Sequence, residues 1–408
     1  MNFDKSTMTW MKLTPAYLII LAFVSLGSCS ETSQDSDHAI VCMDDFHIFF
    51  DPDTLWDELS ENDGWVRWDN GRLLTQSFAV PHFHVRPSIT AHVTLRSAGD
   101  PWDKSGSLML LPNSKESLLD VGFKPSETDS FPGVQLIQRE GFPQYLPPIE
   151  LLRFITPFGV GHFSNMERLD EYRPVYIPEW EDSVRWEADI SHLWEAMKDT
   201  ITLGVYIDTW THEGYKLDMD IQFEAQPLTV QKEAVKRTIS LVNTTKFGSE
   251  QRHFDGFAEG PLIAPFELNE DATNAMLHYT VTGHGGHAEG DEFVPSVHDI
   301  SWNGDSVLSF TPWRSDCASF RRLNPSSGVW MERTYWKGDS LDERIASSDL
   351  SRTGWCPGSM VEPVVIPLGD LKAGQHELKV EVPTAQSFSE DEMNFWNVGV
   401  YLTYEFHE

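Results

Sequence analysis

Alternation of apolar and polar residues is the feature of this sequence that most constrains its fold. Side chains of a β-strand point alternately to opposite faces, so a period of two predicts strands that bury one face and leave the other in water. Half-buried strands of this kind are typical of antiparallel sheets. The alternating segments are Ser88–Arg96, Leu203–Asp208, Leu217–Glu224 and Trp396–Phe406.

Helical signals are few, and turn signals separate the predicted strands. Only Asp53–Leu59 and Asp189–Met197 begin with an aspartate that could cap a turn or two of helix. Asn303-Gly304, between two short apolar segments, is typical of a tight β-hairpin turn. Many short strands with little helix predict an all-β protein built from antiparallel β-sandwiches.

The length of 408 residues exceeds what one hydrophobic core normally organises, since single cores stop growing at roughly 250–300 residues. A clear strand ends near Glu224, Pro227 follows, and the composition then turns polar as far as His253. We therefore expect two tandem β-sandwich domains, at residues 40–226 and 230–408.

The N-terminal segment has the layout of a signal peptide. Lys12 precedes an apolar run of 11 residues at Ala16–Leu26, whereas a membrane-spanning helix needs about 20. The run ends in Leu26-Gly27-Ser28-Cys29, which resembles a bacterial lipobox, whose cysteine is lipidated and becomes the new N-terminus. We expect a signal peptide at 1–28 and a tether at 29–39, with Cys29 anchoring the protein to the bacterial cell envelope, at the outer membrane or cell surface.

The chain has four cysteines, Cys29, Cys42, Cys317 and Cys356. With Cys29 assigned to lipid, three remain for an oxidising compartment. Cys317 and Cys356 could close a loop of about 40 residues, worth roughly 4 kcal/mol in the loop-entropy model. Cys42 is then left over, as a small buried thiol.

The formal net charge of −33 excludes some classes of partner. A strongly acidic surface repels phosphate backbones and anionic lipids, so we expect no nucleic-acid partner and membrane contact only through the lipid anchor. An uncharged glycan is not repelled by this field. The 15 tryptophans suit sugar binding as well as core packing.

Histidines and carboxylates are the candidate functional residues. His82 and His84 lie on one face of a predicted strand, and with His284 and His287 they could bind copper or zinc. No further ligand at convincing spacing completes that set. The carboxylates of interest follow predicted strands or lie in a glycine-rich loop, and they are Asp103, Asp208 and Glu292.

Four sequence blocks occur in order over about residues 60–370. They are Arg153–Phe158 with Val160-Gly161, Asp208–Trp210 with Gly214-Tyr215, Gly286–Ala288 with Glu292 and His298, and Arg352–Gly358. Together they resemble the bacterial peptide-N-glycosidase F family, whose members are asparagine amidases. The resemblance implies two side-by-side eight-stranded jelly-roll sandwiches, in agreement with the alternating pattern.

The resemblance also implies roles for particular residues. Asp103 falls on the family's essential aspartate, and Asp208 and Glu292 fall on two further acids of its site. The residues expected to bind substrate are Lys104, Trp210, His287 and Arg352. Cys317 and Cys356 match a disulfide of the family, which favours the pairing considered above.

The implied reaction is hydrolysis of the amide bond between an N-linked glycan and its asparagine, in glycoproteins or glycopeptides. We expect ionised Asp103 to orient or deprotonate water, while Glu292 and Asp208 bind and polarise the linkage, one of them able to hold a proton. The products are a glycosylamine and a chain in which Asn has become Asp. No metal ion or other cofactor is required.

Departures from the family pattern bear on glycan preference and rate. Lys104 replaces an arginine that can make planar bidentate contacts, Asp208 replaces a longer glutamate, and Gly285 stands where the family has tryptophan. The cysteine pairs that flank the family's first and third acids are absent, and the segment His162–Trp186 is longer than expected. Two other functions stay open, a copper-dependent monooxygenase of similar paired jelly-roll fold and a non-catalytic glycan-binding surface lipoprotein.

Overall fold

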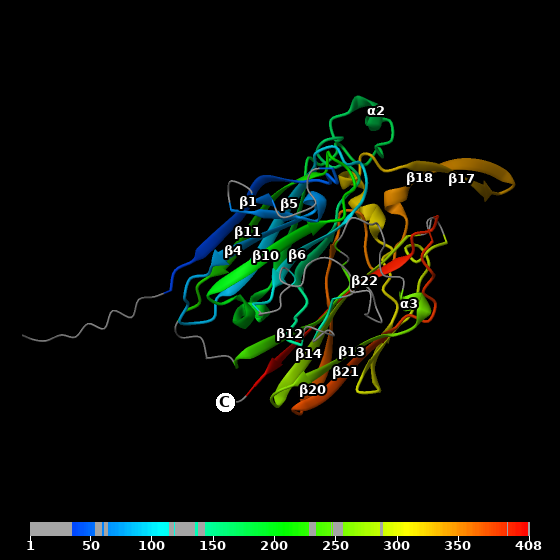
Figure 1. Ribbon diagram of the computed structural model, residues 1–408. Coiled ribbons are helices and arrows are strands. Elements are labelled where there is room, and N and C mark those ends of the chain that lie inside the picture. The colour runs from blue at the N-terminus through cyan, green and yellow to red at the C-terminus, as the bar shows by residue number, and fades with distance from the viewer. Residues whose placement is uncertain are drawn as a thin grey trace, which may run out of the picture. The chain divides into compact units, whose positions relative to one another are not determined.

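Antiparallel β-strands make up most of the regular structure in the computed structural model of the chain (Figure 1), which confirms the predicted all-β class. The structure describes residues 35–53, 59–60, 64–113, 118, 135–137, 143–227, 234–245, 247, 256–285, 289–389 and 391–406. The predicted signal peptide and Cys29 lie outside these residues. Within them, no helix is both long and apolar enough to cross a membrane.

Two antiparallel sheets enclose the first core. One has four strands in the order β1 (His38–Ile48), β11 (Tyr215–Glu224), β5 (Ser88–Ser97) and β9 (Val184–Asp189). The other has seven strands in the order β19 (Met360–Val361), β8 (Ile149–Ile155), β6 (Ser105–Leu111), β10 (Thr200–Ile207), β4 (Leu73–Ala79), β3 (Val66–Trp68) and β2 (Leu59–Ser60). Leu217, Met219, Ile221 and Phe223 of β11 are buried in this core, which confirms the half-buried strand predicted there.

Two further sheets enclose a second core. One has five strands in the order β20 (Val364–Leu371), β14 (Ala272–His284), β22 (Phe395–Glu405), β12 (Lys236–Asn243) and β7 (Gln135–Leu136). The other has four strands in the order β13 (Leu262–Leu268), β21 (Gly374–Glu381), β15 (His298–Trp302) and β16 (Asp305–Phe310). Asn303 and Gly304 connect β15 to β16 with φ angles of 52° and 86°, which confirms the predicted hairpin turn.

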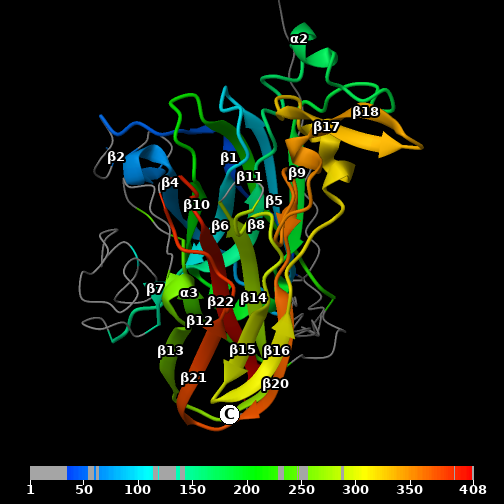
Figure 2. The same ribbon diagram turned by 90° about the vertical axis from the view of Figure 1, so that its right-hand side faces the viewer.

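Short helices and one further hairpin lie between the strands. The helical elements are α2 (Glu167–Asp170), α3 (Gly256–Glu259) and the 3₁₀ turns η1 (Asp69–Gly71), η2 (Ser191–Met197), η3 (Cys317–Leu323) and η4 (Ser347–Asp349). The hairpin of β17 (Val329–Trp336) and β18 (Asp339–Ala346) projects beyond the sheets (Figures 1 and 2). At a predicted helix start, the Asp189 carboxylate accepts the Ser191 amide N–H at 2.9 Å, and η2 follows. Most of Asp53–Leu59, the other predicted helix, lies outside the described residues.

Strand β22 is buried on both faces, which corrects the prediction that one face of Trp396–Phe406 is exposed to water. The reason is that its second face packs against the first sandwich. Arg153 of β8 donates from Nη1 to the Asn397 carbonyl at 2.7 Å, and the His192 ring is bonded to the Tyr401 hydroxyl at 2.9 Å. Strand pairing also connects the two sandwiches, because β19 pairs with β8 and β7 pairs with β12.

Candidate active site

A tight loop between β5 and β6 carries Asp103. The fully buried Asp100 carboxylate holds this loop, since Oδ1 accepts the Trp102 amide N–H at 3.0 Å and Oδ2 accepts the Thr209 hydroxyl at 2.7 Å. The Tyr215 hydroxyl donates to the Trp102 carbonyl at 2.6 Å. Because these partners lie on or close to strands of the first sandwich, the Asp103 side chain extends from a fixed backbone.

The same loop is bonded to both sandwiches. Thr156, just past β8, accepts the Lys104 amide N–H on its hydroxyl oxygen at 2.8 Å, and its own amide N–H donates to the Lys104 carbonyl at 2.8 Å. Ser326, which follows η3, donates its hydroxyl to the Pro101 carbonyl at 2.8 Å. The loop of Asp103 therefore lies where the two sandwiches meet.

Arg352 and Glu292 reach this junction from the second half of the chain. Arg352 Nε donates to Glu292 Oε1 at 2.7 Å, and Arg352 Nη2 lies 3.8 Å from Asp103 Oδ2. The arginine is buried, and its Nη1 donates to the carbonyls of Ser347 at 2.8 Å and Leu350 at 3.0 Å. Two of the three predicted acids thus share one firmly held positive charge.

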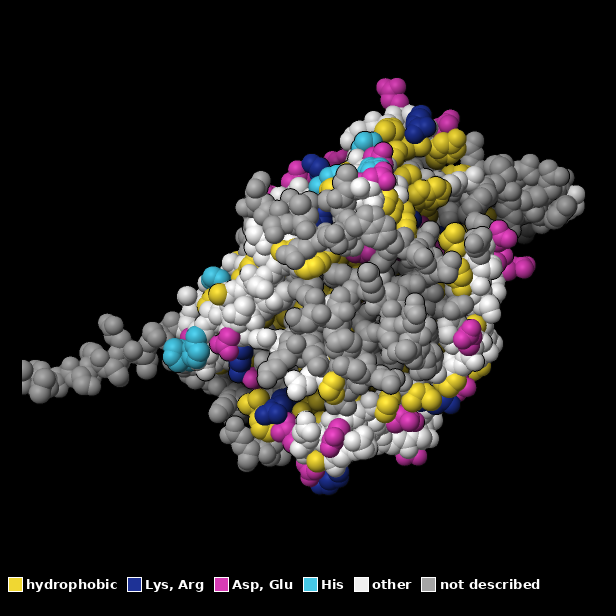
Figure 3. All heavy atoms as spheres, in the orientation of Figure 1, with side chains coloured by type: hydrophobic (Ala, Val, Ile, Leu, Met, Phe, Trp, Pro, Cys, Tyr) yellow, Lys and Arg dark blue, Asp and Glu magenta, His cyan; other side chains and the backbone are white. Residues whose placement is uncertain are grey.

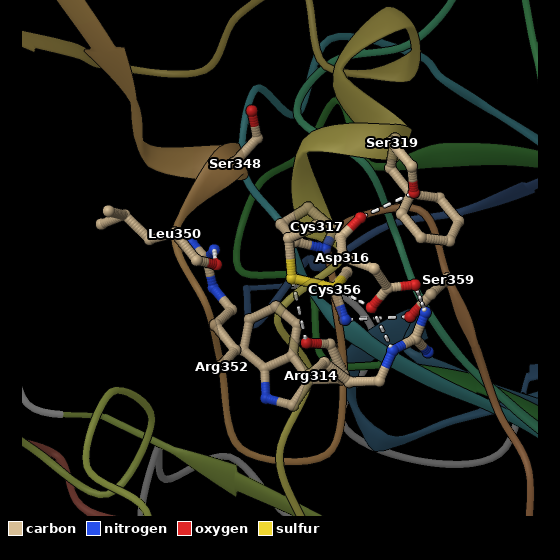
Figure 4. Close-up of a disulfide and its surroundings, with 12 residues drawn as sticks. Arg314, Asp316, Cys317, Ser319, Ser348, Leu350, Arg352, Cys356 and Ser359 are labelled. Carbon is tan, nitrogen blue, oxygen red and sulfur yellow. Dashed lines mark hydrogen bonds and ion pairs between the residues drawn. A yellow bond between two sulfur atoms is a disulfide. The ribbon is translucent and has the colours of Figure 1, made fainter.

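A disulfide joins Cys317 and Cys356 beside Arg352, as predicted (Figure 4). Arg352 and Arg314 exchange backbone hydrogen bonds of 3.0 and 2.8 Å, so the segments that lead into the two cysteines are also paired. The disulfide therefore constrains the backbone from which the Arg352 side chain extends. Cys42 is free and buried in the first core.

Burial raises the pKa of both acids at the junction. The pKa of Asp103 is raised because its carboxyl group is largely shielded from bulk water, while the charges of Arg352 and Lys104 oppose the rise. Burial raises the pKa of Glu292 to about 7, with Arg352 opposing the rise and Asp103 adding to it. The two groups titrate as a linked pair, so the pair can hold a proton near neutral pH.

Asp208 belongs to a second cluster, at the end of β10. Its Oδ1 accepts the Trp210 indole N–H at 2.9 Å and the Tyr206 hydroxyl at 3.2 Å. Arg72 Nη1 lies 3.2 Å from the same oxygen, and the guanidinium stacks on the Trp210 ring at 4.3 Å from its centroid. Arg72 also pairs with Asp69 at 2.9 Å. The third predicted acid is therefore paired with a different arginine, Arg72, which it shares with Asp69.

The Asp208 cluster and Lys104 lie close to Asp103, whereas one predicted residue, His287, lies outside the described part of the chain. A backbone hydrogen bond of 2.9 Å from Asp208 to the Ser105 carbonyl brings the Asp208 cluster beside the Asp103 loop. Lys104 is half-buried, and the neighbouring Trp102 side chain is 57% exposed.

The sequence-based prediction missed Arg72, Asp100 and Tyr206, each of which supports a predicted acid. Asp100 and Tyr206 lie within three residues of Asp103 and Asp208, so nearness in sequence was a usable signal. Arg72 is separated from Asp208 by 136 positions, and only the pairing of β4 with β10 brings the two together.

The histidines considered as copper or zinc ligands lie in other surroundings. The His84 ring is bonded to Asp35 Oδ1 at 2.7 Å, and the His284 ring stacks on those of Trp355 and Phe395. Over the part of the chain that the structure describes, no three His, Cys, Asp or Glu side chains are grouped so that they could hold a metal ion.

The fold and the site define the class of this protein, a pair of β-sandwiches with two partly buried acids and a buried arginine at their junction. Two family descriptions match it, Peptide-N-glycosidase F, N terminal, over residues 39–223 and Peptide-N-glycosidase F, C terminal, over residues 255–403. The chain belongs to the peptide-N-glycosidase F family, which confirms the resemblance found in the sequence.

Solved structures of two proteins are similar to this chain. PNGF-II matches with a TM-score of 0.74 and 29% identity over 91% of this chain, which spans 66% of PNGF-II in one crystal form and 65% in another. PNGase F, a glycosylasparaginase from Flavobacterium meningosepticum, matches with a TM-score of 0.55 and 14% identity over 91% of this chain and 96% of its own. At that identity the likeness to PNGase F concerns the fold alone. No curated protein sequence matches the chain.

Proposed function

We propose that the protein is a peptide-N-glycosidase, which hydrolyses the amide bond between the first N-acetylglucosamine of an N-glycan and asparagine. Its substrates are N-linked glycoproteins or glycopeptides. The observation that carries the proposal is the meeting of Asp103 and Glu292, one from each half of the chain, at the Arg352 guanidinium. Membership of the family and the likeness to PNGF-II support the same reaction.

The two acids suit the two proton transfers of amide hydrolysis. Ionised Asp103 orients a water molecule and takes its proton as the water oxygen attacks the carbonyl carbon of the asparagine side chain. Glu292, whose pKa is raised to about 7, donates a proton to the departing nitrogen. The C–N bond breaks, the glycosylamine leaves, and the asparagine becomes aspartate.

Arg352 and the Asp208 cluster hold the groups around this reaction in place. The Arg352 charge favours the ionised form of Asp103, as the opposing effect on its pKa indicates. The Trp210 indole is fixed by its hydrogen bond to Asp208 and by contact with Phe50, whose ring centroid is 4.9 Å away. Because Trp210 is only partly buried, its free surface is available to pack against a sugar ring.

The exposed Trp102 side chain, beside Asp103, favours a second candidate function, glycan binding without cleavage. Incubation with an N-glycopeptide, followed by mass spectrometry, separates the two. Cleavage by the proposed route leaves a deglycosylated peptide with Asp in place of Asn, and the reaction proceeds with a metal chelator present. A peptide that is bound but recovered intact supports the binding protein. A peptide that keeps one sugar on asparagine rules out the proposed reaction.

A further inference from the structure

The loop that carries Glu292 is fastened to the chain leading into β22 by buried polar contacts. Asp291 is fully buried, and its Oδ1 and Oδ2 accept the Gln386 amide N–H at 3.3 and 3.1 Å. The Asp291 amide N–H donates to Asn394 Oδ1 at 3.0 Å. The Gln386 side chain donates to the Glu289 carbonyl at 2.7 Å. These bonds hold the residues immediately before Glu292.

Gly285 shows how closely these two segments approach each other. Its φ is +85°, and a Cβ atom at this position would overlap the Met393 carbonyl group. Only glycine fits, which gives a physical reason for the glycine found where the family resemblance leads one to expect tryptophan. The Glu292 amide N–H donates to the Gly285 carbonyl at 3.2 Å. Gly285 therefore links the Glu292 backbone, through this hydrogen bond, to the segment that contains Met393.

The backbone of Glu292 is also tied to the arginine that its side chain binds. The amide N–H of Thr353, next to Arg352, donates to the Glu292 carbonyl at 2.9 Å. No cysteine lies near Glu292 in the sequence, so only noncovalent contacts fix this loop. Burial raises the pKa of Asp291 to about 6, with the Gln386 amide N–H opposing the rise. Keeping an ionisable group in the core is costly, so its presence there calls for a compensating role.

We propose that Asp291 is a positioning residue for Glu292. Its buried carboxyl group, bonded to Gln386, fastens the loop so that Glu292 Oε1 lies against Arg352 Nε. The inference rests on the proposed function in one respect, since it takes Glu292 to be a residue that acts on the substrate. Asp291 itself is fully buried and acts through the loop rather than on the substrate.

Steady-state kinetics on an N-glycopeptide test the proposal with Asp291→Ala and Asp291→Asn. A small misplacement of a reacting group can cost about 10²-fold, so we expect Asp291→Ala to lower kcat by about that factor with little change in KM. Asp291→Asn keeps the volume and one acceptor for the Gln386 N–H, so it should restore most of kcat. Asp305→Asn, at an exposed position in the β15–β16 turn, is the control and should match wild type. A wild-type kcat for Asp291→Ala, or a change in KM alone, overturns the proposal.

Hydrogen exchange gives a readout that does not depend on activity. In Asp291→Ala the amide protons of Glu292 and Thr353 should exchange faster than in wild type, and in Asp305→Asn they should not. A wild type that fails to cleave glycopeptide refutes the proposed function, while faster exchange at these amides still supports the positioning role. Unchanged exchange of the Glu292 and Thr353 amide protons in folded Asp291→Ala overturns the positioning role. If Asp291→Ala does not fold, Asp291→Leu takes its place, since leucine keeps the volume of the side chain but has no acceptor for the Gln386 N–H.

Discussion

At the scale of single residues, the proposed chemistry depends on how Arg352 is shared between two acids. Its Nε is committed to Glu292 at 2.7 Å, while its Nη2 lies farther from Asp103, at 3.8 Å. The longer contact leaves the Asp103 carboxylate with oxygen lone pairs that are free to bind water. The shorter contact fixes Glu292 in one orientation, as a proton donor to a departing group requires.

Asp103→Asn should abolish most activity on an N-glycopeptide while the protein stays folded. Asparagine keeps the size and part of the hydrogen bonding of Asp103 but cannot take a proton from water. Loss of a general base typically costs about 10²–10⁴-fold in rate. Initial rates by mass spectrometry, with Asp305→Asn as the matched control, measure the effect. Cleavage by Asp103→Asn at the wild-type rate would show that the assignment is wrong.

The raised pKa of Glu292 predicts two pH dependences. Activity should fall as pH rises through about 7, because the protonated donor is lost. Since the folded-state pKa is raised above the ordinary 4.5, the stability that Glu292 contributes is present below pH 4.5 and is lost as pH rises through about 7. Thermal unfolding of wild type and Glu292→Gln across this range measures the second effect. Wild type should lose stability relative to Glu292→Gln as pH rises from 4.5 through about 7. The same stability difference at both ends of this range would contradict the assignment.

At the scale of elements, the sequence predicted the features that depend on local geometry within a strand or turn. It missed the features that depend on packing between the two sandwiches. Alternation gave the buried face of β11, and Asn303-Gly304 gave the β15–β16 turn, because both depend on local geometry. The same alternation misled at β22, whose second face is covered only because another sandwich packs on it. For the site, the resemblance supplied the three acids and Arg352, whereas Arg72 joins the site through strand pairing between distant parts of the chain.

The disulfide beside Arg352 should contribute measurably to stability. Loops of this size are worth roughly 4 kcal/mol in the loop-entropy model, and native disulfides typically contribute about 2–5 kcal/mol. Replacing both Cys317 and Cys356 by alanine should lower the free energy of unfolding by an amount in that range. Denaturant titration with and without reductant measures the loss, and reductant should have no further effect on the double variant. Equal stability of wild type with and without reductant would mean that the bond contributes nothing.

At the scale of the whole molecule, the surface charge opposes membrane binding, which bears on the expected lipid anchor. Acidic side chains lie at several separate places on the face shown in Figure 3, and the net charge of −33 repels anionic lipid. Attachment to a membrane therefore requires a hydrophobic anchor rather than electrostatic attraction.

Lipidation at Cys29 is the corresponding prediction, made from the lipobox. Cells grown with a fatty-acid probe should label the wild-type protein and should not label Cys29→Ala. The wild-type protein should partition with membranes, while a variant without the label stays in the soluble fraction. An unlabelled wild type would refute the anchor.

Arg153 is held by a buried ion pair within β8 and donates across to the other sandwich, so removing its charge should destabilise the whole molecule. Arg153 Nε donates to Glu150 Oε1 at 3.0 Å, and Arg153 Nη1 donates to the Asn397 carbonyl of the other sandwich at 2.7 Å. Both side chains are nearly inaccessible to water. Arg153→Met removes the cation and leaves the Glu150 carboxylate buried without its charge partner, which typically costs about 3–5 kcal/mol.

Urea unfolding of Arg153→Met measures that cost, and Arg185→Met, at an exposed position on β9, is the matched control. Adding Glu150→Leu to Arg153→Met should recover much of the lost stability, because no charge is then left buried. Since Asn397 lies on β22 and Arg153 on β8, the single variant should also loosen the junction that brings Asp103 to Arg352. Its activity should therefore fall even under conditions where it remains folded. Wild-type stability and activity of Arg153→Met would contradict this role of Arg153.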